Sequence, residues 1–306
     1  MTKNELLQQI MEQPALKVLP LLGETIRQKW EFSHYLHGAV ALEAGLIGQR
    51  PEAECVAVAA GLEVGWAAIL ILDDMVDNDQ VRYHGPSAWA QGGYPKASME
   101  MACGLLVAGR LVESSDREAF LRACSDTIDA MKGICSLPLD TGLLLAEAFF
   151  RNLGALSCFA VAWPWPGDVA LWQVAGYETC AGQLVNDCND CFGAKALRRG
   201  YPDIRNHQVS LLTAILHDHY KHLAMVELVA SADGTSSERV AARMLSVLQE
   251  NPKPLLRVFN KWRSNATELA EGALCAEAGA WAKRRIEKNF AEWRKKLLRL
   301  LQLTEE

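Results

Sequence analysis

The sequence has no excess of positive charge. Its 31 Lys and Arg residues are outnumbered by 37 Asp and Glu residues, which gives a formal net charge of −6 and a pI near 5.7. General binding to nucleic acid requires a basic surface that neutralises phosphate groups, so the composition argues against that class of protein.

A recognisable leader segment is also missing. The first residues, Met1-Thr2-Lys3-Asn4-Glu5-Leu6, open an amphipathic stretch with an early acid, which predicts neither a signal peptide nor a transit peptide. Nine cysteines, an odd number scattered through apolar segments, indicate reduced buried thiols rather than a disulfide framework. We therefore expect a cytoplasmic protein.

The chain lacks a convincing alternating strand pattern and a second long apolar run. One apolar run, residues 55–72, contains a single charge, Glu63, and is long enough to resemble a membrane span. Gly61 and Gly65 interrupt it and an acidic cluster follows at once, so we interpret it as the central helix of a helical bundle. We predict no transmembrane segment and a single all-α domain over residues 1–306.

Apolar residues recur at helical spacing along most of the chain. The pattern predicts helices over residues 5–30 with breaks near Pro14 and Pro20, 32–46, 97–113, 116–133, 141–163, 169–192 after an N-cap at Asp168, 208–230, 236–250 and 253–303. The Gly/Pro-rich residues 82–95 are predicted to form a loop. The basic, amphipathic residues 283–296 predict an exposed helix face, with coverage of a site or contact with an anionic surface as alternatives.

The central apolar run leads directly into Asp73-Asp74-Met75-Val76-Asp77. On a helix, side chains three and four residues apart project from one face, so the three carboxylates lie close together. Carboxylates this crowded repel one another unless a cation lies between them, and their oxygens suit Mg²⁺. The simpler interpretation of one such cluster is a solvated helix end.

A second acidic cluster favours the metal. Residues Gln183 to Asp190 again end an apolar helical run and place Asp187 and Asp190 on one face. Two inward-facing clusters of this kind would hold several Mg²⁺ ions, and such an arrangement binds a diphosphate better than it binds a lone metal.

These motifs resemble the two signatures of the trans-isoprenyl diphosphate synthase superfamily. The first signature, an aspartate pair, a third aspartate, an arginine pair and a glycine, reads here from Asp73 to Gly85; the second reads from Gln183 to Asp190, with Asn186 in place of its first aspartate. The resemblance implies catalytic or metal-binding roles for Asp73, Asp74, Asp77, Arg82, Asp187 and Asp190, and substrate contacts for Trp66, Ile69, Tyr83, Arg151, Gln183, Asn186, Arg198, Arg199 and Asp203.

The family implies an isoprenoid synthase bundle, the class I terpenoid synthase fold, with long helices around a deep central cavity and two acid clusters facing each other across its mouth. Its members bind an allylic prenyl diphosphate such as geranyl, farnesyl or a longer diphosphate through Mg²⁺. Metal and basic residues then stabilise the leaving diphosphate, so that the allylic C–O bond ionises to a carbocation. The resemblance also implies a homodimer.

The departures from the family concern the second substrate. Chain-elongating members hold isopentenyl diphosphate with a basic patch, expected here near residues 32–35, and with a histidine, expected at the position of Trp66; Tyr83 replaces the second arginine. Compared with the family, the site for the second substrate has therefore lost positive charge and gained aromatic surface. We therefore predict transfer of the prenyl cation to an acceptor without a diphosphate, such as an indole or an alcohol, which resembles the tryptophan-modifying peptide-pheromone prenyltransferases. The alternatives are a terpene synthase that cyclises its substrate, ordinary chain elongation, and an inactive regulatory subunit.

Overall fold

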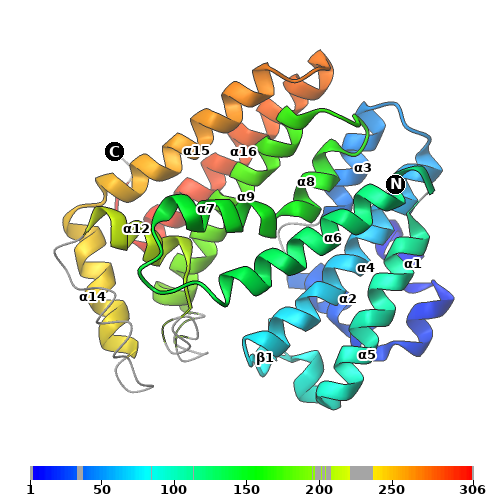
Figure 1. The fold of residues 1–306 in the computed structure, drawn as a ribbon, viewed down its shortest axis with the longest axis horizontal. Helices are drawn as coiled ribbons and strands as arrows, with labels where there is room; N and C mark the ends of the chain where they lie inside the picture. The colour runs from blue at the N-terminus through cyan, green and yellow to red at the C-terminus, as the bar shows by residue number, and fades with distance from the viewer. Residues whose placement is uncertain are drawn as a thin grey trace. The chain divides into compact units, whose positions relative to one another are not determined.

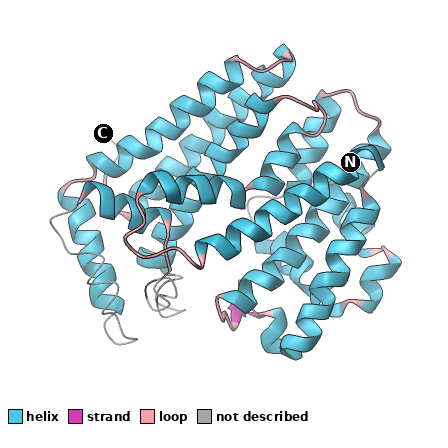
Figure 2. Ribbon diagram, in the orientation of Figure 1, coloured by secondary structure: helices cyan, strands magenta, loops and turns pink. Residues whose placement is uncertain are grey.

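The computed structural model describes residues 3–32, 37–83, 85–112, 114–194, 196, 201, 204, 208–220 and 237–304. The regular elements in these segments are helices, apart from one hairpin of two short strands (Figure 2). This confirms the predicted all-α class. The chain forms two compact units, one of Met1–Ile128 with Ala155–Asp168 and the other of Asp129–Gly154 with Val169–Glu306. The single domain stays a prediction, and each unit is described by itself.

The first unit consists of helices that surround one long apolar helix (Figure 1). Its elements are α1 (Lys3–Met11), the 3-10 helix η1 (Pro14–Val18), α2 (Pro20–Phe32), α3 (His37–Ile47), α4 (Glu52–Val76), β1 (Val81–Arg82), β2 (Gly85–Pro86), α5 (Ala88–Leu111), most of α6 (Ser114–Ile134) and α8 (Ala155–Ala162). Pro14 and Pro20 each open an element, as the sequence predicts, because proline lacks the amide hydrogen that an interior helical position requires.

The central helix of this unit is α4, which packs against α1, α2, α3, α5 and α8. Among the described helices it alone is by itself long and apolar enough to cross a membrane, and 78% of its most apolar window is buried. Glycines permit the close packing: a Cβ on Gly38 would lie 2.6 Å from the carbonyl oxygen of Ala59, and one on Gly61 would lie 2.6 Å from Val112. This burial agrees with the predicted core helix.

The single charge in the apolar run, Glu63, is satisfied inside this core. The Lys29 Nζ atom lies 2.5 Å from its carboxylate, and the two side chains are 2% and 1% exposed. The backbone amide of Gly38 donates to the other carboxylate oxygen at 2.6 Å. Glu63 therefore connects α2, α3 and α4, and its charge is compatible with an apolar helix.

The second unit is arranged around α9 (Val169–Phe192), whose bounds match the predicted helix after Asp168. It packs against α7 (Leu143–Leu153), α12 (Leu211–His219), α14 (Ser237–Glu250), α15 (Lys253–Glu271) and α16 (Ala276–Leu300). The buried Glu178 carboxylate on α9 forms an ion pair with Arg285 at 2.8 Å and accepts a hydrogen bond from Asn289 at 2.9 Å. Both partners lie on α16. Burial raises the pKa of Glu178, while Arg285 and Asn289 act in the opposite direction.

Three predicted boundaries are wrong. The segment 141–163 forms two helices that separate at Gly154, where a Cβ would collide with Thr179. The segment 253–303 is divided by the turn at Gly272 into α15 and α16. The loop predicted over residues 82–95 is also wrong, because α5 begins at Ala88, inside that range. Within α5, Gly93 has a φ of 76° and forms a kink that other residues would disfavour.

Replacing Lys29 by Met should lower the free energy of unfolding by about 3–5 kcal/mol, because Glu63 would remain buried without its counter-charge. Urea unfolding followed by circular dichroism measures the change. Arg27→Met is the matched control, since Arg27 pairs with Glu24 on the exposed face of the same helix and such pairs contribute less than about 1 kcal/mol. Equal stability of the two variants would contradict a structural role for the buried pair.

Candidate active site

Three carboxylates lie at the C-terminal end of α4. The helix ends at Val76, and the Asp77 amide still donates to the Asp73 carbonyl oxygen at 2.9 Å. The three residues therefore have the helical spacing that the sequence predicts. Their exposure differs: Asp74 is buried, Asp77 is half-buried and the Asp73 side chain is 33% exposed. Asp73 and Asp77 are thus the two carboxylates accessible to a ligand from solvent.

Arg82 neutralises the buried part of this cluster. Its Nη2 atom lies 2.5 Å from Asp73 Oδ2 and 2.6 Å from Asp74 Oδ1, and its Nε donates to Asp74 Oδ1 at 2.7 Å. Burial alone would lower the pKa of Arg82, but the carboxylates of Asp73 and Asp74 raise it above its usual range. The guanidinium stays cationic and fixes the orientation of both acids.

A small hairpin that the sequence analysis did not predict carries Arg82. Strands β1 and β2 pair antiparallel, with Arg82 opposite Gly85, and the Ser87 amide donates to the Gln80 carbonyl oxygen at 2.9 Å. Tyr83 occupies the turn with φ of 54°, which a two-residue hairpin loop requires. The prediction of an irregular loop at residues 82–95 is therefore wrong at its start. The strands are too short to produce an alternating pattern.

In the second unit, α9 presents the other acidic cluster. Asp187 is buried, and both of its carboxylate oxygens have protein partners: Gln183 Nε2 donates to Oδ1 at 2.9 Å, and the Leu212 amide donates to Oδ2 at 3.2 Å. Burial, together with the nearby Asp190, raises the pKa of Asp187 to about 7, although the hydrogen-bond donors act in the opposite direction. Asp187 thus caps the first turn of α12. The neighbouring Asn186, by contrast, is exposed.

Trp66 and His37 form an aromatic pair on α4 and α3. Their ring centroids lie 4.3 Å apart, and His37 Nε2 lies 2.9 Å from the Ser157 hydroxyl oxygen. His37 is buried, while Trp66 is half-buried. His37 is therefore a core residue with a hydroxyl partner.

The other predicted substrate contacts are distributed over both units. Ile69 is buried in α4, and Tyr83 is half-buried in the hairpin turn. The Arg151 guanidinium lies over the Tyr177 ring, 4.5 Å from its centroid. Three predicted contacts, Arg198, Arg199 and Asp203, lie outside the described residues, as do residues 33–35 of the expected basic patch.

The donor chemistry of both clusters fits Mg²⁺, which prefers hard oxygen ligands. Asp73 and Asp77 supply accessible carboxylates in the first unit, and Asp190 and Asn186 supply a half-buried carboxylate and an exposed amide oxygen in the second. In the part of the chain that the structure describes, no three His, Cys, Asp or Glu side chains already lie in a metal-binding arrangement. Crowded carboxylates require a nearby cation, and at Asp74 this cation is the Arg82 guanidinium.

Comparison of the sequence with protein-family models and with curated proteins gives no match. The fold, by contrast, matches solved structures closely. Geranylgeranyl pyrophosphate synthetase from the archaeon Geoglobus acetivorans superposes with a TM-score of 0.71 at 14% identity, over 94% of this chain and 97% of that one.

Two bacterial structures match equally well. Polyprenyl synthase from Caulobacter crescentus, complexed with calcium and isoprenyl diphosphate, gives a TM-score of 0.75 at 16% identity over 94% of this chain and 93% of that one. Decaprenyl diphosphate synthase from Rhodobacter capsulatus gives 0.72 at 17% identity over 95% of each chain. The chain therefore has the predicted isoprenoid synthase fold.

Replacing Asp187 by Ala should lower the free energy of unfolding by about 1–3 kcal/mol, because the Leu212 amide and the Gln183 side chain would lose their acceptor in a buried place. Asn186→Ala, one residue away on the exposed face, should change stability by less than about 0.5 kcal/mol. Thermal and urea unfolding distinguish the two variants. If Asp187→Ala is as stable as Asn186→Ala, the cap on α12 does not contribute.

Proposed function

We propose that this chain is an enzyme of the trans-isoprenyl diphosphate synthase superfamily, which binds an allylic prenyl diphosphate and catalyses loss of its diphosphate group. The observation that carries the proposal is Arg82, a cation held against Asp73 and Asp74 at the end of a buried apolar helix. The fold match and the two acidic motifs support the same family.

Asp73 and Asp77 in one unit, and Asn186 and Asp190 in the other, are the proposed Mg²⁺ ligands. When bound, Mg²⁺ neutralises the negative charge that develops on the departing diphosphate. Asp187 remains part of the proposed motif, and its hydrogen bonds to Gln183 and Leu212 support a first role in holding the first turn of α12 against α9. The proposed role of Asp74 is likewise to orient Arg82.

Arg82 is proposed to donate to oxygens of the diphosphate, because its fork of N–H groups matches such oxygens. The apolar side chains of α4, such as Ile69, are proposed to contact the hydrocarbon tail and to keep water from the carbocation. Trp66 presents an aromatic face, and such faces stabilise cations.

Asp73→Asn should reduce Mg²⁺-dependent release of diphosphate from geranyl or farnesyl diphosphate by about a hundredfold or more, because an oriented ligand is lost at the leaving group. Asp126→Asn is the control: Asp126 is an exposed acid on α6 and undergoes the same change of charge. A colorimetric diphosphate assay measures both. Near-normal release by Asp73→Asn would contradict the site, and no release by the wild type with any allylic chain length would favour an inactive regulatory subunit.

The acceptor is a separate question with two candidates. The solved structures of similar fold are named as prenyl diphosphate synthases, which favours isopentenyl diphosphate and chain elongation. The aromatic pair of Trp66 and His37 and the substitution by Tyr83 favour an acceptor without a diphosphate, or attack by the double bonds of the substrate itself. The loss of cationic residues where a second diphosphate would bind is the physical reason for keeping the second candidate.

Incubation with farnesyl diphosphate and Mg²⁺, with and without isopentenyl diphosphate, distinguishes these reactions by their products. If the aromatic substitutions determine the acceptor, isopentenyl diphosphate will give no longer prenyl diphosphate, and mass spectrometry of the extract will show a cyclised product or, with indole present, a prenylated indole. Efficient formation of a longer prenyl diphosphate would assign chain elongation instead.

The proposed homodimer has one supporting feature in α5. Met99 and Leu106 are 59% and 67% exposed and lie seven residues apart on one face of that helix. Large apolar side chains in such a row are typical of a surface that another chain covers.

A further inference from the structure

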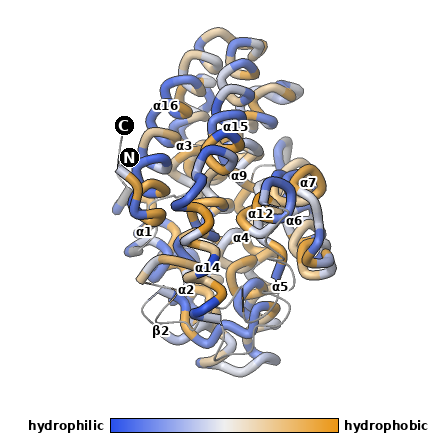
Figure 3. The backbone as a smooth tube through the Cα atoms, turned by 90° about the vertical axis from the view of Figure 1, so that its left-hand side faces the viewer, coloured by the Kyte–Doolittle hydropathy of each residue, from blue (hydrophilic) through white to orange (hydrophobic). Residues whose placement is uncertain are grey.

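Positive charge is concentrated in the last two helices of the second unit. Residues 253–304 contain 12 of the 31 Lys and Arg residues of the chain but five of its 37 Asp and Glu residues. This segment is therefore strongly basic within a protein whose net charge is −6. Figure 3 shows much of α15 and α16 as hydrophilic.

The two helices form an antiparallel hairpin. They pack against each other and are connected by the short turn after Glu271. The basic first half of α15 consequently lies at the same end of the hairpin as the basic second half of α16. Glu268, Glu271 and Glu277 lie toward the turn.

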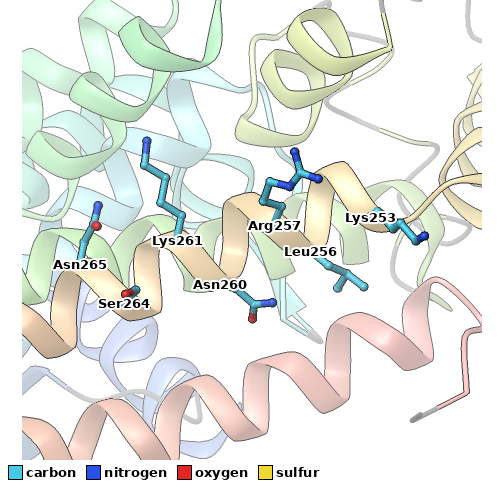
Figure 4. Close-up of a pocket in the computed structure, with 7 residues that line it drawn as sticks. All are labelled: Lys253, Leu256, Arg257, Asn260, Lys261, Ser264 and Asn265. Atoms are coloured by element: carbon cyan, nitrogen blue, oxygen red, sulfur yellow. The ribbon is translucent and has the colours of Figure 1, made fainter.

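A groove of about 610 Å³ runs along α15 at the basic end. Its lining residues all come from this helix and are Lys253, Leu256, Arg257, Asn260, Lys261, Ser264 and Asn265. Lys253, Arg257 and Lys261 are exposed and four residues apart, and the side chains of Arg257 and Lys261 extend to the same side (Figure 4). None of the described residues that line the groove is a carboxylate.

Two other basic residues of the hairpin have acidic partners. Lys283 pairs with Glu271 and Arg285 pairs with Glu178. Lys253, Arg257 and Lys261, in contrast, have no acidic partner within 4.0 Å among the described residues. On α16, Lys288, Lys295 and Arg299 are exposed on one helix face together with the exposed acid Glu292, so that face carries both signs of charge.

We propose that the α15 basic face, defined as Lys253, Arg257 and Lys261, binds the surface of a lipid bilayer that carries anionic headgroups. Each Lys or Arg near such a surface strengthens binding roughly fivefold. The choice of a bilayer over an acidic protein rests on the proposed function, because a prenyl diphosphate has a hydrocarbon tail that partitions into lipid. Attachment there brings the enzyme to its substrate.

The test is sedimentation of the full chain with vesicles of phosphatidylcholine alone or with one third phosphatidylglycerol. The wild type should bind only the anionic vesicles, and the binding should weaken with salt because the charges lie at the surface. The triple variant Lys253→Gln, Arg257→Gln and Lys261→Gln should lower the affinity roughly a hundredfold.

The matched control is Lys17→Gln, Arg110→Gln and Lys132→Gln, three exposed basic residues elsewhere in the chain with the same total change of charge. This control should bind like the wild type. An equal loss of vesicle affinity in both triple variants would show that binding depends only on net charge, and this result would overturn the proposal. Failure of the wild type to bind anionic vesicles while it binds polyglutamate would also overturn it, in favour of an acidic protein partner.

A second readout separates this proposal from the proposed function. Without vesicles, the basic-face triple variant should release diphosphate from water-soluble geranyl diphosphate at the wild-type rate, because its residues are not among the proposed ligands. Vesicle binding that depends on the basic face, in a protein that releases no diphosphate, would contradict the proposed function and support the surface. Loss of diphosphate release in the variant would instead indicate that the basic face belongs to the active site.

Discussion

Carboxylates inside an apolar helical bundle require partners, and this requirement determines how both central helices are held. An unpaired buried carboxylate costs several kcal/mol, by an order-of-magnitude estimate. On α4, Glu63 is paired with Lys29 and Asp74 with Arg82. On α9, Asp187 satisfies amide donors from its own helix and from α12. Each of these three acids has at least one partner on a different element, so it also fixes a neighbouring helix or hairpin.

Much of the fold was predictable because helical periodicity is a local signal. The bounds of α9 and the breaks at Pro14 and Pro20 follow from residues within a few positions of each boundary. The apolar run around Glu63 predicted a core helix for a similar reason, since only the interior of a bundle suits a helix that is apolar on all sides. Boundaries at Gly154 and Gly93 were missed because tertiary contacts or a single kink decided them.

The candidate site was predictable in its composition but not in its partners. Helical spacing placed the three carboxylates of α4 together, yet nothing in the spacing indicates that Arg82 would bridge two of them. That contact depends on a hairpin of two-residue strands, which is too short to leave a periodic pattern. The sequence also could not show that Asp187 is buried while Asn186 is exposed. The burial of Asp187 depends on its contact with the backbone of α12, twenty-five residues away along the chain.

The bridge made by Arg82 has a consequence for how the end of α4 is held. In small metalloproteins the ion supplies the charge compensation that the chain itself lacks, so folding waits for the metal. Here one internal guanidinium already pairs with both Asp73 and Asp74 and offsets one of their two negative charges. The end of α4 is therefore held to the hairpin by a cation that belongs to the chain itself.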